Sequence, residues 1–154
     1  MSSGESKGLR SEFAKADLII AAVFLISGSA LVASNHLMSS EGLLTFIGAK
    51  GISVSPLAAL FFQKLHPSVS IVLGASAVFG WKTFLYFNVF VAAAAIPLVG
   101  AACRRWFGDS GWVASVMLAL SPLYFLSAVT GQSNTTAIAL FALSLWLADG
   151  TERR

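Results

Sequence analysis

The stretch that decides the fold is RRWFGD, residues 104–109. It is a short polar segment between two long apolar runs, residues 84–103 and 112–129. Burying one guanidinium at the centre of a membrane helix costs about 2.5–3.5 kcal/mol, so Arg104 and Arg105 favour a membrane surface. Lys and Arg near the ends of spans prefer the cytoplasmic side. The stretch therefore predicts a cytoplasmic hinge, called the basic hinge below, which sets the direction of every other span.

The composition predicts an integral membrane protein. Of 154 residues, 56% are hydrophobic and only 11% are charged, whereas an ordinary soluble domain is about 25% charged. The formal net charge is +3, but the basic residues are scattered at the ends of apolar runs. This distribution indicates orientation in a lipid bilayer and argues against a nucleic-acid partner. Cys103 is the single cysteine, which excludes an internal disulfide and is typical of a small apolar filler.

We expect an all-α fold with four transmembrane helices and both termini in the cytoplasm. The expected spans are residues 18–33, 84–103, 112–129 and 135–148. They form a membrane domain over residues 17–149, between a cytoplasmic tail (residues 1–16) and a cytoplasmic end (residues 150–154). This arrangement places the basic tail, the basic hinge and the terminal arginines on one side of the membrane. The predicted location is the inner (plasma) membrane of a bacterium.

The long outer loop between the first two spans, residues 34–82, predicts two or three interfacial helices. Ser40 is expected to cap the first helix, and Gly51 to end it after residue 50. A second helix with one apolar stripe is expected after Ser55, because a proline follows in the favoured first position. The third piece, residues 67–79, is apolar but too short to cross, so we expect it to be interfacial or re-entrant.

Glu41 is the only carboxylate expected on the outer side. A carboxylate there suits a general base acting on an acceptor hydroxyl. It equally suits the first turn of a helix, where it interacts with the helix dipole. His36 and His66 are the other candidate metal ligands outside, but their spacing to Glu41 matches no compact metal motif. We therefore expect no metal site.

Four short motifs follow one another along the chain: SEGLL (residues 40–44), SPL (55–57), RRWFG (104–108) and LALSPL (118–123). Their order resembles the N-terminal part of the GT-C glycosyltransferases. This polytopic family includes the protein mannosyltransferases and the lipid A aminoarabinose transferases. The resemblance covers roughly residues 18–148.

The resemblance implies that Glu41 is the catalytic base. It also implies that His36, Lys50 and Lys82 assist with the phosphate of a polyprenyl-phosphate sugar donor. Ser40 departs from the family pattern, because members carry the first acid of an Asp-Glu pair at this position. Family members also have many more spans, and those spans contribute to the donor site.

We therefore expect a small membrane subunit with a GT-C-like scaffold, non-catalytic alone and packed against other membrane subunits. The alternative is a module of a polyprenyl-phosphate-sugar-dependent glycosyltransferase that acts on the outer face. The sequence ends soon after the fourth expected span, which fits a small subunit or the front of a longer protein. A transporter or channel is disfavoured, because no buried charge is expected to mark an ion path through the spans.

Overall fold

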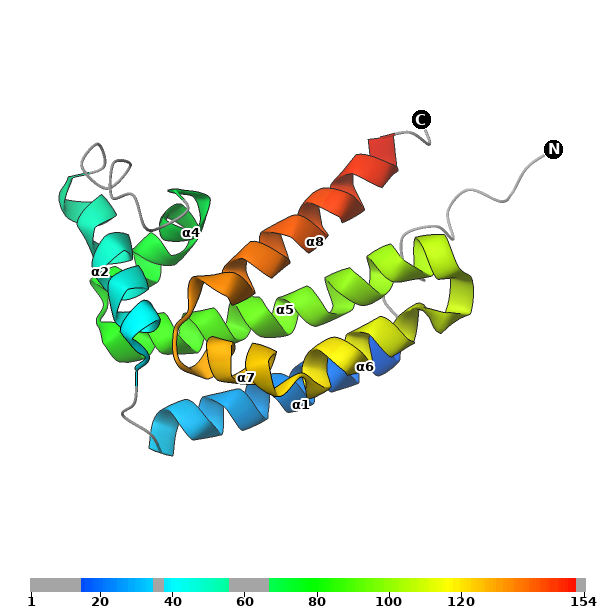
Figure 1. Ribbon diagram of the computed structural model, residues 1–154, viewed down its shortest axis with the longest axis horizontal. Helices are drawn as coiled ribbons and strands as arrows, with labels where there is room; N and C mark the ends of the chain where they lie inside the picture. Colours follow the sequence, from blue (N-terminus) through cyan, green and yellow to red (C-terminus); the bar gives the residue numbers. More distant parts are fainter. Residues whose placement is uncertain (1–14, 35–37, 56–66, 152–154) are drawn as a thin grey trace.

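The computed structural model describes residues 15–34, 38–55 and 67–151, and every regular element in these residues is a helix (Figure 1). This confirms the all-α fold class. The elements are α1 (Lys15–Ser34), α2 (Ser40–Val54), α4 (Pro67–Val78), α5 (Trp81–Phe107), the 3-10 helix η2 (Gly108–Gly111), α6 (Trp112–Leu120), α7 (Pro122–Val129) and α8 (Ser133–Thr151). The helix expected after Ser55 falls on residues 56–66, which lie outside the described residues.

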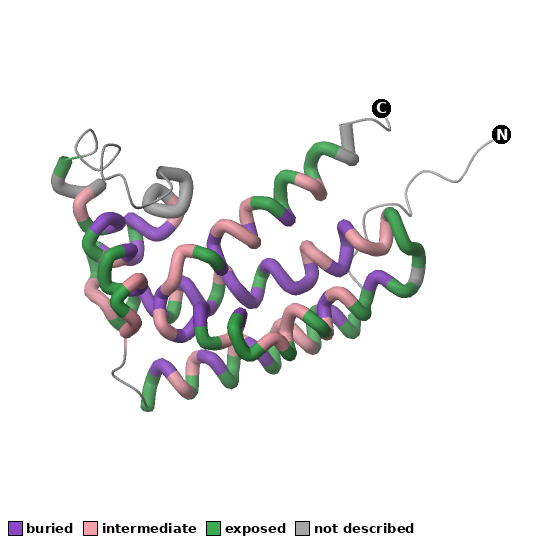
Figure 2. Tube along the Cα trace, viewed as in Figure 1, coloured by how far each residue is buried: buried purple, intermediate pink, exposed green. Residues whose placement is uncertain are grey.

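The central helix of the bundle is α5, which packs against α1, α4, α6, α7 and α8. Figure 2 shows buried residues along most of α5, whereas α1 buries a single stripe. Small side chains such as Ala92, Ala95 and Ala101 let the neighbouring helices approach α5 closely. On α1, a Cβ added at Gly28 would lie 2.8 Å from Val89 Cγ1 of α5. Glycine therefore permits the observed contact between these two helices.

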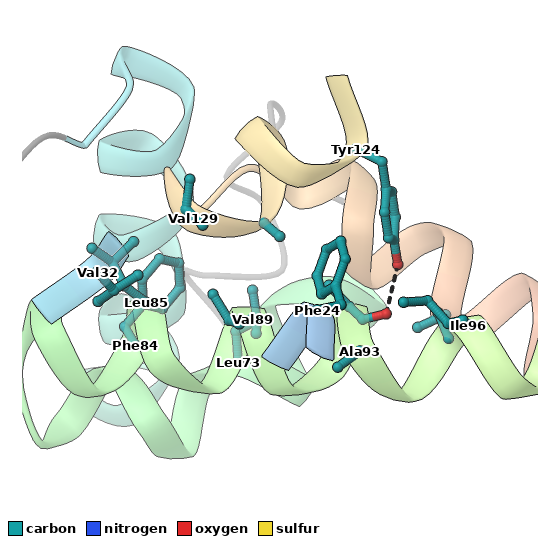
Figure 3. Close-up of a cluster of buried hydrophobic side chains, with 14 of the residues drawn as sticks. Phe24, Val32, Leu73, Phe84, Leu85, Val89, Ala93, Ile96, Tyr124 and Val129 are labelled. Atoms are coloured by element: carbon teal, nitrogen blue, oxygen red, sulfur yellow. Dashed lines mark hydrogen bonds between the residues drawn. The ribbon is translucent and has the colours of Figure 1, made fainter. Parts of the chain in front are cut away.

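Aromatic side chains join α1, α5 and α7 in the core (Figure 3). The ring of Phe24 on α1 lies 5.7 Å from that of Tyr124 and 5.2 Å from that of Phe125, centroid to centroid. Such tilted and edge-on pairs stabilise beyond the area they bury. The Tyr124 hydroxyl donates a hydrogen bond to the Ala92 carbonyl oxygen of α5 (2.9 Å). A buried tyrosine thus satisfies its polar atom while its ring packs in the core.

Ser121 divides the apolar run 112–129 into α6 and α7, which are bent by 63° relative to each other. Its backbone is extended, and its Oγ accepts a hydrogen bond from the Tyr124 N–H (3.3 Å). Pro122 occupies the first turn of α7, where its missing N–H costs nothing. A proline also disfavours the helical conformation of the residue before it. The expected single third span is therefore two helices joined at a sharp bend.

The helices α2 and α4 pack on each other at the end of the bundle where α5 begins (Figure 1). The N-cap of α2 is Ser39, not Ser40 as expected: Ser39 Oγ accepts a hydrogen bond from the Gly42 N–H (2.9 Å). The helix also continues past Gly51 to Val54. The prediction of its end was wrong because Gly51 does not adopt the left-handed conformation that terminates a helix.

Among the described helices, α1 and α5 are each long and apolar enough to cross a membrane. A third crossing results if α6 and α7 form one bent span. The apolar part of α8, Ser133–Ala148, is shorter. Large apolar side chains point outward from α1, where Ile19 is 64% and Ile26 69% exposed. These candidate spans are compatible with a membrane protein whose outer surface contacts lipid.

Candidate functional site

Glu41, the candidate base, lies half-buried in the first turn of α2. The Ser133 hydroxyl donates a hydrogen bond to Glu41 Oε1 (3.0 Å). Ser133 is the first residue of α8. The carboxylate therefore lies beside the N-terminal ends of two helices, whose dipoles both favour a negative charge. This arrangement agrees with the helix-start interpretation of Glu41.

The backbone next to Glu41 is held tightly against the turn between α7 and α8. A Cβ at Gly42 would collide with the carbonyl oxygen of Thr130. Gly131 has a φ of +79°, which glycine adopts without strain, and a Cβ there would lie 2.7 Å from the Phe84 ring. The rings of Phe46 and Phe84 meet edge-on, with centroids 5.4 Å apart. Glu41 is thus fixed by packing on both sides.

Two of the three candidate phosphate ligands, Lys50 and Lys82, lie in the described residues. Lys50 lies on α2 nine residues after Glu41, which is about 13 Å along the helix axis. Its Nζ lies 6.0 Å from the centroid of the Phe46 ring. Lys82 lies in the first turn of α5, with Nζ 5.7 Å from the Trp81 ring centroid. His36 lies outside the described residues.

A second polar site, which the sequence analysis missed, joins the first turn of α1 to the last turns of α5. The Asp17 side chain has no exposed surface, and its Oδ2 lies 2.5 Å from Arg104 Nη2. The Arg104 side chain is only 16% exposed. The sequence analysis did not anticipate this buried ion pair. Asp17, which directly precedes the expected first span (residues 18–33), neutralises one arginine of the basic hinge.

Glycines make room for this ion pair. A Cβ at Gly100 would collide with Ser115 Oγ of α6 and lie 3.0 Å from each carboxylate oxygen of Asp17. The Ser115 hydroxyl donates to the Ile96 carbonyl oxygen (3.2 Å), so it also tethers α6 to α5. A Cβ at Gly111 would collide with the backbone of Arg104. The helices α1, α5 and α6 therefore meet at the ion pair with no space for a larger residue.

The other arginine of the basic hinge holds α8. Arg105 Nη1 donates a hydrogen bond to the Trp146 carbonyl oxygen (2.8 Å), and its guanidinium carbon lies 5.9 Å from the Trp146 ring centroid. Two adjacent arginines thus bind two different helices, α1 and α8. This brings the start of α1, the end of α5 and the last turns of α8 to one end of the bundle (Figure 1).

Asn88, on the buried face of α5, makes a neutral polar site nearer the opposite end. Its amide nitrogen donates to the carbonyl oxygens of Ser127 (3.3 Å) and Ala128 (2.9 Å). Its amide oxygen accepts from the hydroxyls of Thr135 (3.0 Å) and Thr136 (3.3 Å). All of these groups are buried. One side chain therefore fixes both the end of α7 and the start of α8 on α5.

Within residues 15–34, 38–55 and 67–151, no cluster of three or more His, Cys, Asp or Glu could hold a metal ion. The two carboxylates with assigned partners serve helix packing: Asp17 binds Arg104, and Glu41 binds Ser133. Comparison with known protein families, curated proteins and solved structures finds no match to this chain.

A signal for Asp17 was present in the sequence. The buried residues of α1 are Asp17, Phe24, Gly28 and Val32, which fall on one helical stripe. Extending the stripe of Gly28 and Phe24 back by two turns reaches Asp17. The first span was expected to begin at residue 18, which left Asp17 outside it, although its register places it on the buried face.

Proposed function

We propose that this chain is a polytopic membrane subunit that crosses the bilayer four times, through α1, α5, the bent pair α6–α7, and α8. It is non-catalytic alone and packs in a larger membrane complex. Both termini face the cytoplasm of a bacterial inner membrane, as does the basic hinge. This orientation rests on the preference of Lys and Arg near span ends for the cytoplasmic side.

The proposed fourth crossing is supported by one observation: α8 is attached to α5 near both ends of α8. Near its start, Thr135 bonds Asn88, and near its end, the Trp146 carbonyl accepts from Arg105. Asn88 and Arg105 lie about 25 Å apart along α5, and the 19 residues of α8 extend about 28 Å. These lengths approach the roughly 30 Å of a bilayer's hydrocarbon core.

The subunit role is supported by the contacts of the candidate catalytic side chains and by the apolar outer surface. Glu41 is occupied in joining α2 to α8, and its candidate helper Lys50 lies nine residues further along α2. The outward apolar side chains continue onto α6 and α7, where Met117 is 70% and Leu123 74% exposed. Such surfaces suit lipid or the spans of partner chains.

Single-cysteine accessibility in a Cys103→Ser background tests the topology. Four crossings place Lys82→Cys and Asn134→Cys on the outer side, and Lys15→Cys and Trp106→Cys on the cytoplasmic side. A membrane-impermeant thiol reagent applied to sealed inverted vesicles should label only the second pair. Labelling of Asn134→Cys and Trp106→Cys from the same side would disprove the α6–α7 crossing.

The alternative function is a module of a GT-C-type transferase that uses Glu41 as the base and a polyprenyl-phosphate sugar as donor. One observation favours it: Glu41 is partly exposed at the α2 end of the bundle. In this alternative, Lys50, Lys82 and His36 contact the donor phosphate.

Purification of the complex that contains this chain allows the two functions to be separated. If the chain is catalytic, Glu41→Gln should abolish sugar transfer, because an amide does not accept the proton. Ser133→Ala serves as the control, since it removes the hydrogen bond to Glu41 but keeps the carboxylate. Equal transfer by wild type and Glu41→Gln would eliminate the catalytic role.

A further inference from the structure

An apolar groove runs between α1 and the bent pair α6–α7. Its volume is about 380 Å³. Ile19, Val23 and Ser27 line it from α1, with Ala119 from α6 and Phe125 from α7. The groove exists because the break at Ser121 turns α7 away from the direction of α6.

The groove has a charged end. Lys15, Ile19, Val23 and Ser27 follow one another at intervals of four residues, so they occupy one face of α1. Lys15 is exposed in the first turn, one turn beyond the lining residue Ile19. The neighbouring acid, Asp17, is paired with Arg104, so Asp17 does not neutralise the charge of Lys15. The face therefore presents an ammonium group followed by an apolar channel.

The lining of the groove decides what fits it. Apart from Ser27, every residue that lines the groove is apolar, so an occupant must be apolar along its length. A single hydrocarbon chain has this character. In a bilayer, acyl chains surround the groove at high concentration, so the nearest ligand is a lipid.

We propose that this groove holds one acyl chain of an anionic phospholipid whose phosphate pairs with the Lys15 ammonium. The proposal rests on the membrane location of α1 and α6–α7 proposed above. Lipid tails are as apolar as the groove lining, so apolar contact alone does not select a lipid. Selection comes from the charge at Lys15, which matches the excess negative charge of the head group.

Retention of lipid by the purified protein tests this proposal. The chain is extracted in mild detergent, incubated with phosphatidylglycerol or phosphatidylcholine, and weighed by native mass spectrometry. Wild type should retain one phosphatidylglycerol. Ala119→Phe should lose it, because the ring fills the groove. Ala22→Phe, at an exposed position of α1 that does not line the groove, is the matched control and should retain it.

Two further variants sharpen the result. Lys15→Gln should lower the preference for phosphatidylglycerol over phosphatidylcholine by about fivefold, because one lysine near an anionic surface contributes on the order of 1 kcal/mol. Ser27→Phe fills the groove from an exposed position, so it repeats the Ala119→Phe test without altering a packed residue. Equal lipid retention by wild type, Ala119→Phe and Ser27→Phe would mean general annular lipid and would overturn the proposal.

The readouts separate this proposal from the topology. If the cysteine labels report the four crossings but lipid retention is unchanged by groove filling, only the lipid site is wrong. If the protein fails to float with liposomes, the proposed membrane location is wrong, and the proposed lipid site is wrong as well. The wild type could also prove to be a dimer that the Ala119→Phe substitution converts to a monomer. That result would show that a second chain occupies the groove, and it would contradict the proposed lipid site.

Discussion

The two halves of α5 are held in different ways. Near its C-terminus, α5 is joined to α1 by the buried ion pair of Arg104 and Asp17. In its N-terminal half, it is joined to α7 and α8 by Asn88, a neutral amide with four hydrogen-bonding partners. The charged contact lies within the end turns of its helices, which the proposed topology places close to water and head groups. The same topology places the neutral contact where a charge would be far more costly.

The comparison teaches what each contact requires of its partners. The amide of Asn88 is satisfied by four groups and tolerates the loss of one. The ion pair consists of two charges that neutralise each other, so removal of either leaves the other buried. We therefore expect the charged end to be the more sensitive of the two.

The largest effect is expected for Asp17→Leu. It leaves Arg104 facing an apolar surface and should lower the free energy of unfolding by about 3–5 kcal/mol. The measurement is a denaturation titration in mixed micelles followed by circular dichroism. The double variant Asp17→Leu, Arg104→Met removes both charges and should recover most of the loss. A double variant as unstable as the single one would show that the pair is not the source of the sensitivity.

Asn88→Ala should have the next largest effect. Interhelical hydrogen bonds in membrane proteins average about 0.6 kcal/mol, so four of them amount to about 2–3 kcal/mol. Asn134→Ala is the matched control, because Asn134 is exposed on α8, and it should change stability by less than about 0.5 kcal/mol. If Asn88→Ala destabilised more than Asp17→Leu, the ranking of the two halves of α5 would be reversed.

Gly100→Ala tests the close packing around the ion pair. The added Cβ meets Ser115 Oγ and should destabilise by about 1–3 kcal/mol. Gly51→Ala is the control: it adds the same methyl group to α2, where nothing lies within 4 Å of the new Cβ, and should be neutral or stabilising by up to about 1 kcal/mol. Combining Gly100→Ala with Ser115→Ala should recover only part of the loss, since the colliding hydroxyl is removed but the Asp17 oxygens still lie 3.0 Å from the added Cβ.

Glu41→Ala should have the smallest effect, about 1 kcal/mol, because it removes one hydrogen bond from a partly exposed carboxylate. A double-mutant cycle with Ser133→Ala isolates the contact: the double variant should lose little more than either single variant. Simple addition of the two losses would show that Glu41 and Ser133 act separately, and would weaken the structural interpretation of Glu41.

Much of the fold followed from composition and periodicity. Long apolar runs predicted helices over α1, α5 and α8, because their length and hydropathy leave few other structures. The break at Ser121 was not anticipated, since the apolar run continues through it unchanged and only the Ser-Pro pair marks it. A hydropathy value averaged over a window of residues does not report such a local change in backbone direction.

The contacts that organise the site were less predictable, because each joins residues far apart in the sequence. Glu41 was singled out, but its partner Ser133 lies 92 residues away. Asn88 was overlooked because one amide barely changes the hydropathy of an apolar run. Asp17 was left just outside the expected first span, although its helical register matched the buried stripe of Phe24 and Gly28.

The pairing of Asp17 with Arg104 has a consequence for biosynthesis. A ribosome adds about 5–20 residues per second, so Asp17 is made about 4–17 s before Arg104. In the proposed topology, α1 enters the membrane with an unmatched acid, which its position in the first turn makes tolerable at the lipid–water boundary. Stable lateral association of α1 therefore has to wait for the completion of α5, and the order of synthesis dictates the order of assembly.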